Sequence, residues 1–372
     1  MKLQLIYFGR LEIEKGFDLV IRLLEKSKVD FHINIFGKGS MESELLSIKS
    51  TNYTFHGRKS LEEIKEFLLN SHFSLMPSRF LETFGLVALE SLTYGIPVIG
   101  FKKGGLEAFV LDNLDINRQK GASEIEKLNN LITDLSDNLS QDDLIELKEK
   151  SISISKNYSL NIRKNNIQEI LKGKKILIVS DYLDLLGGIE TYIYNTKEIL
   201  ESMGYEVRLF GFKSTSGKLN KIQRLLMFFS VAYNFVYQRK IQKEIEDFAP
   251  DIIRTHSISR FLGWKVADEI SKSKCEKLIM YHDLGYFHPY PSKVYQISQI
   301  EKFDYSSFIK MGNTRSLLKK LSISFKYIFL KILMKRLNNF DLHMVPSEFM
   351  ISLLQNHFPK DKIQTLPHYL KD

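Results

Sequence analysis

The chain alternates short apolar runs with segments in which apolar residues recur at helical spacing. In its first part, helical spacing is clear at residues 15–24 and 61–69, and from about residue 122 to 171 the pattern is helical and polar. This alternation predicts an α/β fold with a parallel, doubly wound sheet. The apolar runs that predict its strands lie at residues 3–8, 31–36, 53–57, 73–77 and 97–100.

A polar break at residues 172–175 separates this part from a second one, in which the alternation begins afresh. We therefore predict two α/β domains, residues 1–172 and residues 173–372. The runs that predict strands in the second domain lie at residues 176–181, 206–210, 251–256, 277–282, 341–347 and 363–367.

The composition is that of a globular protein long enough for two domains, with 372 residues, 44% of them hydrophobic and 26% charged. The single cysteine, Cys275, excludes an internal disulfide and suits a reducing compartment. The start of the chain lacks the apolar stretch of a secretory signal, and no apolar run approaches the roughly 20 residues that span a bilayer. These features predict a cytoplasmic protein.

The net charge of +9 is unevenly distributed along the chain. Residues 1–172 hold 23 Lys and Arg against 24 Asp and Glu, whereas the remainder holds 30 against 20. Only the second part is basic, which predicts a surface for an anionic partner there. Nucleic acid is a poorer fit, because no recognised nucleic-acid-binding motif accompanies the charge.

The stretch around Gly85 carries the most specific chemical pattern. Gly85 permits a tight turn between the apolar run at 73–77 and a helix that begins at Leu86. Such a turn directs unpaired backbone N–H groups at one point, and these groups together with the helix dipole favour an anion. Glu82 and Glu90 flank the turn and suit hydroxyl groups, so a nucleotide-sugar fits both features. A solvated helix with two surface glutamates is the alternative.

Arg10 and Lys15 lie between the first predicted strand and the first predicted helix. Ligands of open α/β sheets bind at the carboxyl ends of the strands. The two cations are suited to holding a diphosphate there, Arg10 by its forked donors and Lys15 as a point charge. Ordinary surface charge is the alternative.

Two histidines, His256 and His282, each end a predicted strand of the second domain. A histidine at a strand end serves either as a structural hydrogen-bond donor or in catalysis. Two of them on neighbouring strand ends favour a functional role more than one does, and both interpretations stay open at this stage.

Several motifs resemble those of retaining nucleotide-sugar glycosyltransferases, in particular glycosyltransferase family 4 with the two-domain GT-B fold. Glu82-x7-Glu90, with Phe84-Gly85 after the first Glu, looks like the signature of that family. The segment 9–16 matches its G-R-x4-K-G diphosphate motif. The resemblance implies two Rossmann-like, doubly wound domains that face each other across a cleft.

The resemblance also implies a role for each candidate residue. His282 and Glu82 are the implied catalytic residues: His282 would contact the sugar or support the transition state, and Glu82 would hold the donor sugar. Glu90 would bind the ribose hydroxyls. The chain departs from the family after Gly105, where one residue instead of two precedes Glu107. The other implied donor-binding residues are Gly9, Arg10, Lys15, Gly57, Arg58, Phe84, Gly85, Leu86, Gly187 and Gly188.

The two domains come in an unexpected order. Residues 1–172 resemble the family's C-terminal, donor-binding domain, and residues 173–372 resemble its N-terminal, acceptor-side domain. The chain therefore resembles a circularly permuted enzyme, and permutation is tolerated where native termini lie close together and exposed. The alternative is a segment that spans two tandem enzymes and holds the back of one and the front of the next.

Two segments of the basic part, 218–243 and 319–336, mix basic with aromatic and aliphatic residues. This mixture is typical of an interfacial helix on an anionic membrane. The alternative is a helix whose apolar side packs in the domain core while its lysines are solvated. We expect the membrane, because two such segments lie in one basic half.

The resemblance implies transfer of a sugar from a nucleotide-sugar donor to an acceptor with retention of configuration. The expected acceptor is a lipid-linked or cell-surface polysaccharide precursor, used in the cytoplasm or peripherally on the inner face of the membrane. No Asp-x-Asp occurs in the sequence, so we expect no metal or other cofactor, and the cations take over that role. The alternatives are a non-catalytic GT-B protein that binds a nucleotide or a partner, and a GT-B sugar epimerase.

Overall fold

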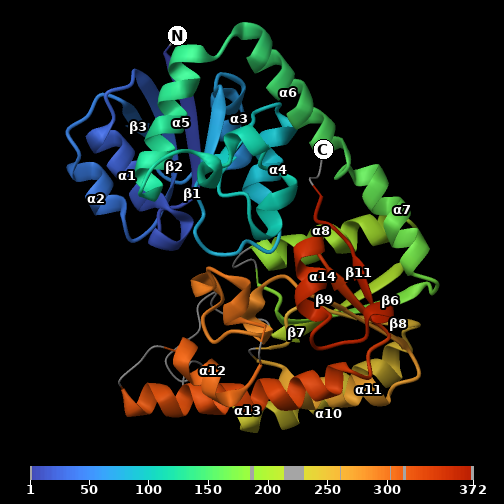
Figure 1. Cartoon of the computed structure of the whole chain (residues 1–372). Coiled ribbons are helices and arrows are strands. Elements are labelled where there is room, and N and C mark those ends of the chain that lie inside the picture. Colours follow the sequence, from blue (N-terminus) through green and yellow to red (C-terminus); the bar gives the residue numbers. More distant parts are fainter. Residues whose placement is uncertain are drawn as a thin grey trace. The chain divides into compact units, whose positions relative to one another are not determined.

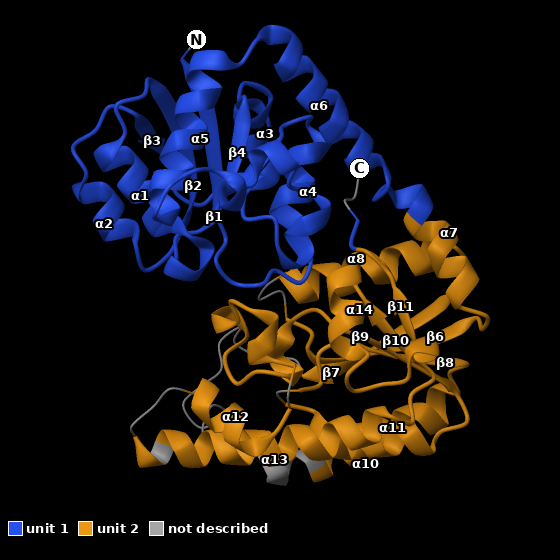
Figure 2. Ribbon diagram, in the orientation of Figure 1, with its two compact units in different colours: residues 1–162, 368–370, 372 blue, residues 163–367, 371 orange. Residues whose placement is uncertain are grey.

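The computed structural model describes residues 2–184, 188–212, 230–259, 261–301, 303–312 and 316–369. They form two compact units (Figure 1, Figure 2). Unit 1 comprises residues 1–162 with a short C-terminal segment that includes His368, and unit 2 comprises residues 163–367. Each unit is built on one parallel sheet, so the predicted α/β class with two doubly wound domains is confirmed. The predicted cleft between the domains stays a prediction.

The sheet of unit 1 has the strand order β3-β2-β1-β4-β5, and its neighbouring strands are parallel. Its strands are β1 (Leu3–Arg10), β2 (Phe31–Lys38), β3 (Tyr53–Phe55), β4 (Phe73–Met76) and β5 (Val98–Gly100). Its helices are α1 (Phe17–Lys26), α2 (Glu42–Ser47), α3 (Leu61–Leu69), α4 (Leu86–Thr93), α5 (Glu124–Asn138) and α6 (Gln141–Lys156), and α7 (Leu160–Ile170) contains the boundary to unit 2.

Helices cover both faces of this sheet because successive strand residues point to opposite sides. Leu3 and Leu5 of β1 are buried in a cluster with residues of α1 and α5. Ile6 and Phe8 belong to a second cluster, which contains residues of α3. Both faces of β1 are therefore apolar, as a central parallel strand requires, and only the strand ends remain for polar chemistry.

The sheet of unit 2 has the order β11-β10-β9-β8-β6-β7 and is also parallel. Its strands are β6 (Lys175–Tyr182), β7 (Glu206–Phe212), β8 (Ile252–Thr255), β9 (Glu276–Met280), β10 (Leu342–Val345) and β11 (Ile363–Thr365). Its helices are α8 (Gly188–Ser202), α10 (Ser230–Phe248), α11 (Gly263–Lys272), α12 (Tyr305–Met311), α13 (Leu317–Leu337) and α14 (Glu348–Leu354).

Helices α10, α11 and α13 lie together on one side of the unit 2 sheet, and α8 and α14 lie on the other (Figure 1). The predicted basic–aromatic segment 319–336 lies within α13. Of the segment 218–243, the part before Ser230 lies outside the described residues, and the rest belongs to α10. Within the described ranges, no helix is both long and apolar enough to cross a membrane.

Candidate active-site residues in the two units

The carboxyl ends of β1, β2 and β3 meet at glycines. Gly9 lies opposite Gly37 in the parallel register, and the Gly37 N–H donates to the Gly57 carbonyl oxygen at 2.8 Å. A Cβ on Gly37 would lie 1.8 Å from the Gly9 carbonyl oxygen, so only glycine permits this approach. The exposed Arg10 and Arg58 follow directly after two of these glycines. The structure therefore brings these four predicted residues, Gly9, Arg10, Gly57 and Arg58, to one edge of the sheet.

Lys15 and Glu82 form an ion pair at this edge. Lys15 Nζ lies 2.6 Å from Glu82 Oε1, and the Ser78 hydroxyl donates to the same oxygen at 2.7 Å. Gly16 positions Lys15: it has a φ of +70°, and a Cβ there would lie 1.9 Å from the Pro77 carbonyl oxygen. The two charged side chains are only 18% and 10% exposed, so solvent screens their attraction less than that of a surface pair. The sequence named both residues but did not reveal that they pair.

Tyr7 is hydrogen-bonded to the backbone of Arg10 and is influenced by the charge of Glu82. Its ring is buried, and its hydroxyl donates to the Arg10 carbonyl oxygen at 2.7 Å. Burial raises the pKa of Tyr7 far above its ordinary value, and the negative charge of Glu82 adds to the rise while Arg10 opposes it. The charges of Arg10 and Glu82 therefore both influence the pKa of Tyr7.

The turn after Glu82 has the predicted form. Gly85 has a φ of +103° and precedes α4, whose first residue is the exposed Leu86. The Leu89 N–H donates to the Gly85 carbonyl oxygen, so the amides of the first turn before Leu89 are directed out of the helix end. This helix end is a suitable place for an anion.

Phe84 supports the turn from inside. Its ring is 3% exposed and packs edge-on against His368, with 5.0 Å between the ring centroids. The Gly105 N–H donates to the Glu82 carbonyl oxygen at 2.7 Å, and a Cβ on Gly105 would lie 2.5 Å from Phe84 Cα. The loop in which the chain departs from the family motif is therefore packed directly against the turn. The Phe84 ring is not available to a ligand.

Glu90 lies on the second turn of α4, and its side chain is partly buried. Burial raises the pKa of Glu90 from its ordinary 4.5 to about 7, because the charged carboxylate loses hydration. This carboxyl group therefore changes its charge near neutral pH. Ionised, it only accepts hydrogen bonds from hydroxyl groups, and protonated, it can also donate one.

In unit 2, His256 and His282 follow the neighbouring strands β8 and β9, as predicted. His256 Nδ1 lies 2.8 Å from His282 Nε2, so one imidazole donates to the other. The pKa of His282 is lowered to about 3, mainly by burial and in addition by the positive charges of Arg254 and Arg163. His282 is therefore neutral at physiological pH and presents a hydrogen-bonding imidazole without charge.

Three buried residues next to His282, namely Tyr192, Arg163 and Arg254, were not predicted from the sequence. The buried Arg254 donates from Nη2 to the Tyr192 hydroxyl at 3.1 Å, and the buried Arg163 donates to the same hydroxyl. The Tyr192 ring packs edge-on against His282 at 4.9 Å between centroids. Burial alone would raise the pKa of Tyr192, but the charges of Arg163 and Arg254 outweigh it and lower the pKa. One signal was available: an arginine within the apolar strand 252–255 is unusual unless it is paired.

The loop after β8 is held by two buried polar side chains. One carboxylate oxygen of Asp181 accepts the N–H groups of Phe261 and Leu262 at 2.9 and 2.7 Å. The Tyr286 hydroxyl donates to the His256 carbonyl oxygen at 3.1 Å. These bonds fix the backbone that carries His256, and through it the imidazole pair.

Two further predictions concern the glycine pair Gly187–Gly188 and metal binding. Gly188 is the first residue of α8, whereas Gly187 lies outside the described residues, so the predicted role of this glycine pair stays a prediction. Across the parts of the chain that the structure describes, no three His, Cys, Asp or Glu side chains are grouped so as to hold a metal ion.

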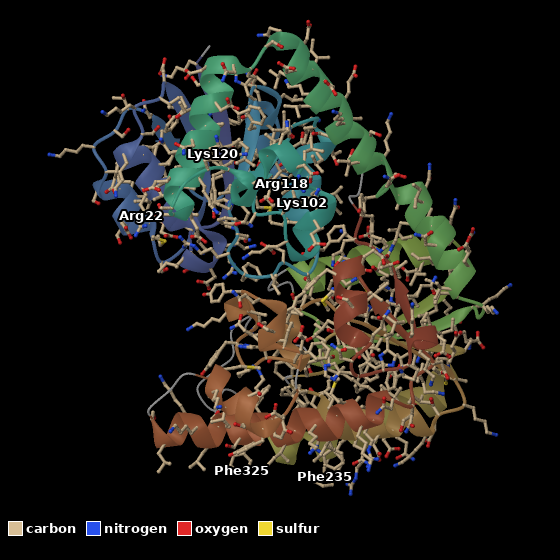
Figure 3. The ribbon with its side chains drawn as sticks, in the orientation of Figure 1. Arg22, Lys102, Arg118, Lys120, Phe235 and Phe325 are labelled. Atoms are coloured by element: carbon tan, nitrogen blue, oxygen red, sulfur yellow. The ribbon has the colours of Figure 1, made fainter. Side chains whose placement is uncertain are left out.

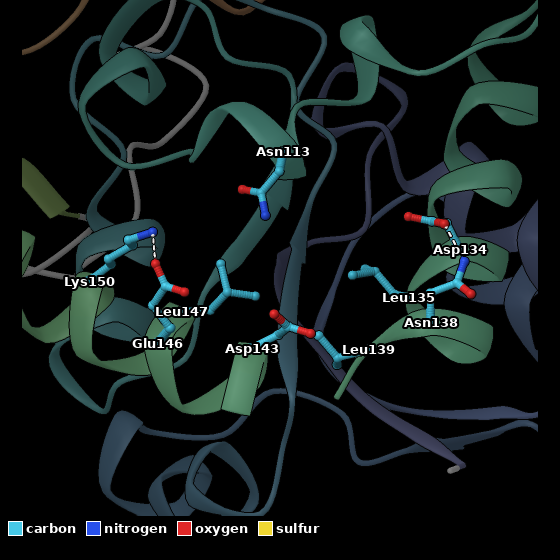
Figure 4. Close-up of a pocket in the computed structure, with 9 residues that line it drawn as sticks. All are labelled: Asn113, Asp134, Leu135, Asn138, Leu139, Asp143, Glu146, Leu147 and Lys150. Atoms are coloured by element: carbon cyan, nitrogen blue, oxygen red, sulfur yellow. Dashed lines mark hydrogen bonds and ion pairs between the residues drawn. The ribbon is translucent and has the colours of Figure 1, made fainter. Parts of the chain in front are cut away.

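A surface pocket of about 200 Å³ lies in unit 1 between α5 and α6 (Figure 4). Several of its charged side chains already have partners: Lys150 pairs with Glu146, and Asp143 accepts from the hydroxyl and the backbone N–H of Ser140. The pocket contains none of the residues predicted for the site. We therefore place the candidate site at the strand ends and not in this pocket.

Both parts of the chain match models of known glycosyltransferase families. Residues 1–151 match the family model of glycosyl transferases group 1, and residues 186–369 match the model of Glycosyltransferase Family 4. The chain therefore contains a group 1 glycosyltransferase domain followed by a family 4-like glycosyltransferase domain.

Similar curated proteins align with about a third of the chain. An uncharacterised protein of the cps region of Klebsiella pneumoniae is 31% identical over 30% of this chain and 31% of its own. An uncharacterised glycosyltransferase of Methanocaldococcus jannaschii is 32% identical over 29% and 31%. A D-inositol 3-phosphate glycosyltransferase of Arthrobacter is 29% identical over 30% and 29%. The chain thus covers only about a third of each of these relatives.

Two solved structures show a partial likeness. The catalytic domain of cholesterol-α-glucosyltransferase from Helicobacter pylori is 16% identical, with a TM-score of 0.35, over 43% of this chain and 100% of that one. The Anabaena protein HepE in complex with UDP-glucose is 18% identical, with a TM-score of 0.38, over 45% and 48%.

Proposed function

We propose that this protein is a glycosyltransferase that moves a sugar from a nucleotide-sugar donor to an acceptor. The family models that match both parts of the chain support this, as do the names of the curated relatives. The observation that carries the proposal is the Lys15–Glu82 pair at the carboxyl end of β1. There, a cation suited to phosphate and a carboxylate suited to sugar hydroxyls lie 2.6 Å apart.

The leaving group of such a transfer is a nucleoside diphosphate, whose negative charge grows as the glycosidic bond breaks. Groups that stabilise this developing charge accelerate the reaction. Arg10, Lys15 and the amides at the start of α4 would do so, together with the glycine pair that ends in Gly188. When the diphosphate arrives, Lys15 would turn from Glu82 towards the phosphate oxygens. Glu82 would then be free to accept hydrogen bonds from the donor sugar.

The other residues complete the donor site. Glu90 would accept hydrogen bonds from the ribose hydroxyls in its ionised form. Arg58 and Gly57 would lie near the base, next to the strand ends that carry Arg10. His282, held neutral, would contact the sugar or support the transition state as an uncharged hydrogen-bonding group. We propose that these residues act without a metal, and activity that persists in a strong chelator would support this.

We propose that transfer retains the configuration at the anomeric carbon, as the family 4 resemblance implies. The test is proton NMR of the first product formed from a donor of known configuration. The anomeric coupling constant of the new bond should match that of the donor. An inverted product would contradict retention without contradicting transfer.

We also propose that the chain is one circularly permuted enzyme. The order of the matched domains, group 1 before family 4, supports this. A re-permuted chain, with residues 173–372 placed before residues 1–172, should fold and catalyse the same transfer. If the chain instead joined pieces of two tandem enzymes, neither order would be active alone.

The central experiment offers the purified chain a set of nucleotide-sugars and measures nucleoside diphosphate release, with and without crude acceptor lipids. We expect one donor to stabilise the protein against heat and to release its diphosphate. A lipid-linked or cell-surface polysaccharide precursor is the proposed acceptor, because the second part of the chain is basic. Its addition should raise the rate of release.

The same experiment separates the alternatives. Binding of a nucleotide-sugar without any diphosphate release would identify a non-catalytic nucleotide-binding protein. Recovery of the donor with an altered sugar would identify an epimerase. The failure of every nucleotide-sugar to bind would contradict the proposed function as a whole.

A further inference from the structure

Helix α13 is apolar on two opposite sides. Its buried side contains Ile323, Tyr327, Leu330, Leu333 and Leu337, which pack into unit 2. The opposite side is exposed and should be polar in a helix that only covers a core. Instead, it carries four apolar residues that repeat at helical spacing: Leu317, Leu321, Phe325 and Ile328, with exposed fractions of 72%, 47%, 64% and 52%.

We call these four residues the outer stripe of α13. The stripe extends over the twelve residues from Leu317 to Ile328, or about 17 Å at the rise of an α-helix. A protein surface rarely presents a row of large apolar side chains unless something binds there. We therefore expect the outer stripe to bind a partner outside the described residues.

The charges of α13 indicate what kind of partner this is. The helix contains six basic residues and no acidic residue. Arg336 is paired with Asp268 of α11, whereas Lys320, Lys331 and Lys335 are exposed. At 3.6 residues per turn these three lysines flank or continue the outer stripe. Along α13 itself, the exposed apolar side chains are thus accompanied by positive charges and by no negative charge.

Helix α10 adds a second exposed aromatic group on the same side of the unit. Phe235 is exposed, and Lys265 Nζ lies 4.5 Å from its ring centroid. Figure 3 shows Phe235 and Phe325 pointing away from the sheet at the outer surface of the helices. Arg239 and Lys240, further along α10, are exposed as well. The basic and apolar surface therefore extends beyond α13.

We propose that the outer stripe of α13 and its lysines dock on an anionic lipid bilayer, with the helix lying in the interface. Apolar residues would insert among the acyl chains, and the lysines would contact lipid phosphates. Among the described residues, no helix is long and apolar enough to span the membrane. A second copy of the chain is a poorer partner, because pairing two such helices would bring like charges together.

From the sequence alone, we expected membrane binding by two segments, 218–243 and 319–336. In the structure, the row of exposed apolar residues lies on α13. The inference does not rest on glycosyltransferase activity. Vesicle binding can be measured without any nucleotide-sugar, so its failure and the failure of the proposed function are distinguishable.

The test is sedimentation of the full chain with vesicles of phosphatidylcholine, alone or mixed with phosphatidylglycerol. We expect binding to the mixed vesicles that weakens with salt. Leu321→Ser with Phe325→Ser should weaken it about tenfold or more, because the inserted apolar area is lost. Leu46→Ser with Leu69→Ser is the matched control, since both residues are exposed apolar positions of unit 1, and binding should not change.

Charge is tested separately. Lys331→Glu with Lys335→Glu should also weaken binding to mixed vesicles at least about tenfold, since each lysine near an anionic surface contributes to attachment. Lys49→Glu with Lys120→Glu, at exposed positions of unit 1, makes the same change in net charge and should have little effect.

Three outcomes would overturn the proposal. The first is equal binding to neutral and anionic vesicles at every salt concentration. The second is binding that is unchanged in both α13 variants. The third is self-association of the chain that the Leu321 and Phe325 changes abolish, without vesicle binding, which would make the stripe an interface between copies.

Discussion

The two candidate sites lie at equivalent places, the carboxyl ends of parallel strands, yet they handle charge in opposite ways. In unit 1, Lys15 and Glu82 form an ion pair at the sheet edge. In unit 2, the imidazole at the edge, His282, is kept neutral, and the positive charges of Arg163 and Arg254 lie buried behind it. Strand ends of the same kind thus carry an ion pair, whose partners can change, in unit 1. In unit 2 they carry an uncharged imidazole, and the charged arginines are buried.

This difference suggests a division of work under the proposed function. A site with exchangeable charges suits the binding and release of a diphosphate, because the partner of Lys15 can change. A neutral imidazole suits contact with an uncharged sugar, because it adds no net charge near the reacting carbon. Changes in unit 1 should therefore act mainly on donor affinity, and changes in unit 2 mainly on turnover.

The largest effect is expected from His282→Ala. Under the proposed function, His282 would support the transition state, so its loss should lower kcat about 100-fold or more, while donor affinity changes little. Steady-state kinetics and calorimetry with the nucleoside diphosphate measure the two quantities. His32→Ala, a partly exposed histidine of unit 1, is the control. A parallel loss of affinity would remove the contrast between the units.

Lys15→Met should lower affinity for the nucleoside diphosphate about 10- to 100-fold, as expected for a lost charge-assisted contact. It should also destabilise the fold, because Glu82 loses its cation in a partly buried place. Adding Glu82→Gln should restore stability but not affinity, which separates the two effects. Lys26→Met, at an exposed position, should change neither. Full affinity in the Lys15 variant would exclude this residue from the diphosphate site.

Glu90 should give a pH dependence with opposite signs for ligand and fold. Its pKa of about 7 lies above the ordinary 4.5, so the folded protein holds this proton up to about pH 7. As the pH rises from about 4.5 through 7, this group's contribution to stability is lost, whereas affinity for the ribose should increase, up to about tenfold. Glu90→Gln should flatten both profiles. An unchanged affinity profile in that variant would remove Glu90 from the ribose site.

The smallest effect concerns the buried charges of unit 2. Arg254→Met should raise the pKa of His282 from about 3, but not to its ordinary 6.5, because burial is the larger cause. Arg254→Lys keeps the charge and should leave the pKa near its original value. NMR titration of the His282 ring distinguishes the two variants. An equal pKa in both would show that Arg254 does not act on His282 through its charge.

Much of the fold could be predicted because it follows from local periodicity. The runs at 3–8 and 73–77 became β1 and β4, and the helix at 61–69 was predicted with its observed bounds. The sequence placed His256 and His282 on neighbouring strand ends, and β8 pairs with β9. The hydrogen bond between the two imidazoles was not predicted.

The remainder depends on contacts that periodicity does not encode. The Lys15–Glu82 pair requires Gly16 to pack on Pro77, which is 61 residues away in the sequence. The pKa of Glu90 comes from burial and not from its neighbours in the chain. The hydrogen bonds that Arg163 and Arg254 donate to the Tyr192 hydroxyl join three separate elements. Each of these features appears only when the tertiary packing is known.

The Lys15–Glu82 pair has a consequence for ionic strength. Lys15 already has a counter-charge in the protein, so an anionic ligand replaces one partner of Lys15 with another and displaces few salt ions from it. The exposed Arg10, in contrast, must release its loosely held ions to bind the same ligand. The release of bound ions is what makes affinity fall with added salt. The decrease of affinity with salt should therefore depend on Arg10 and hardly on Lys15.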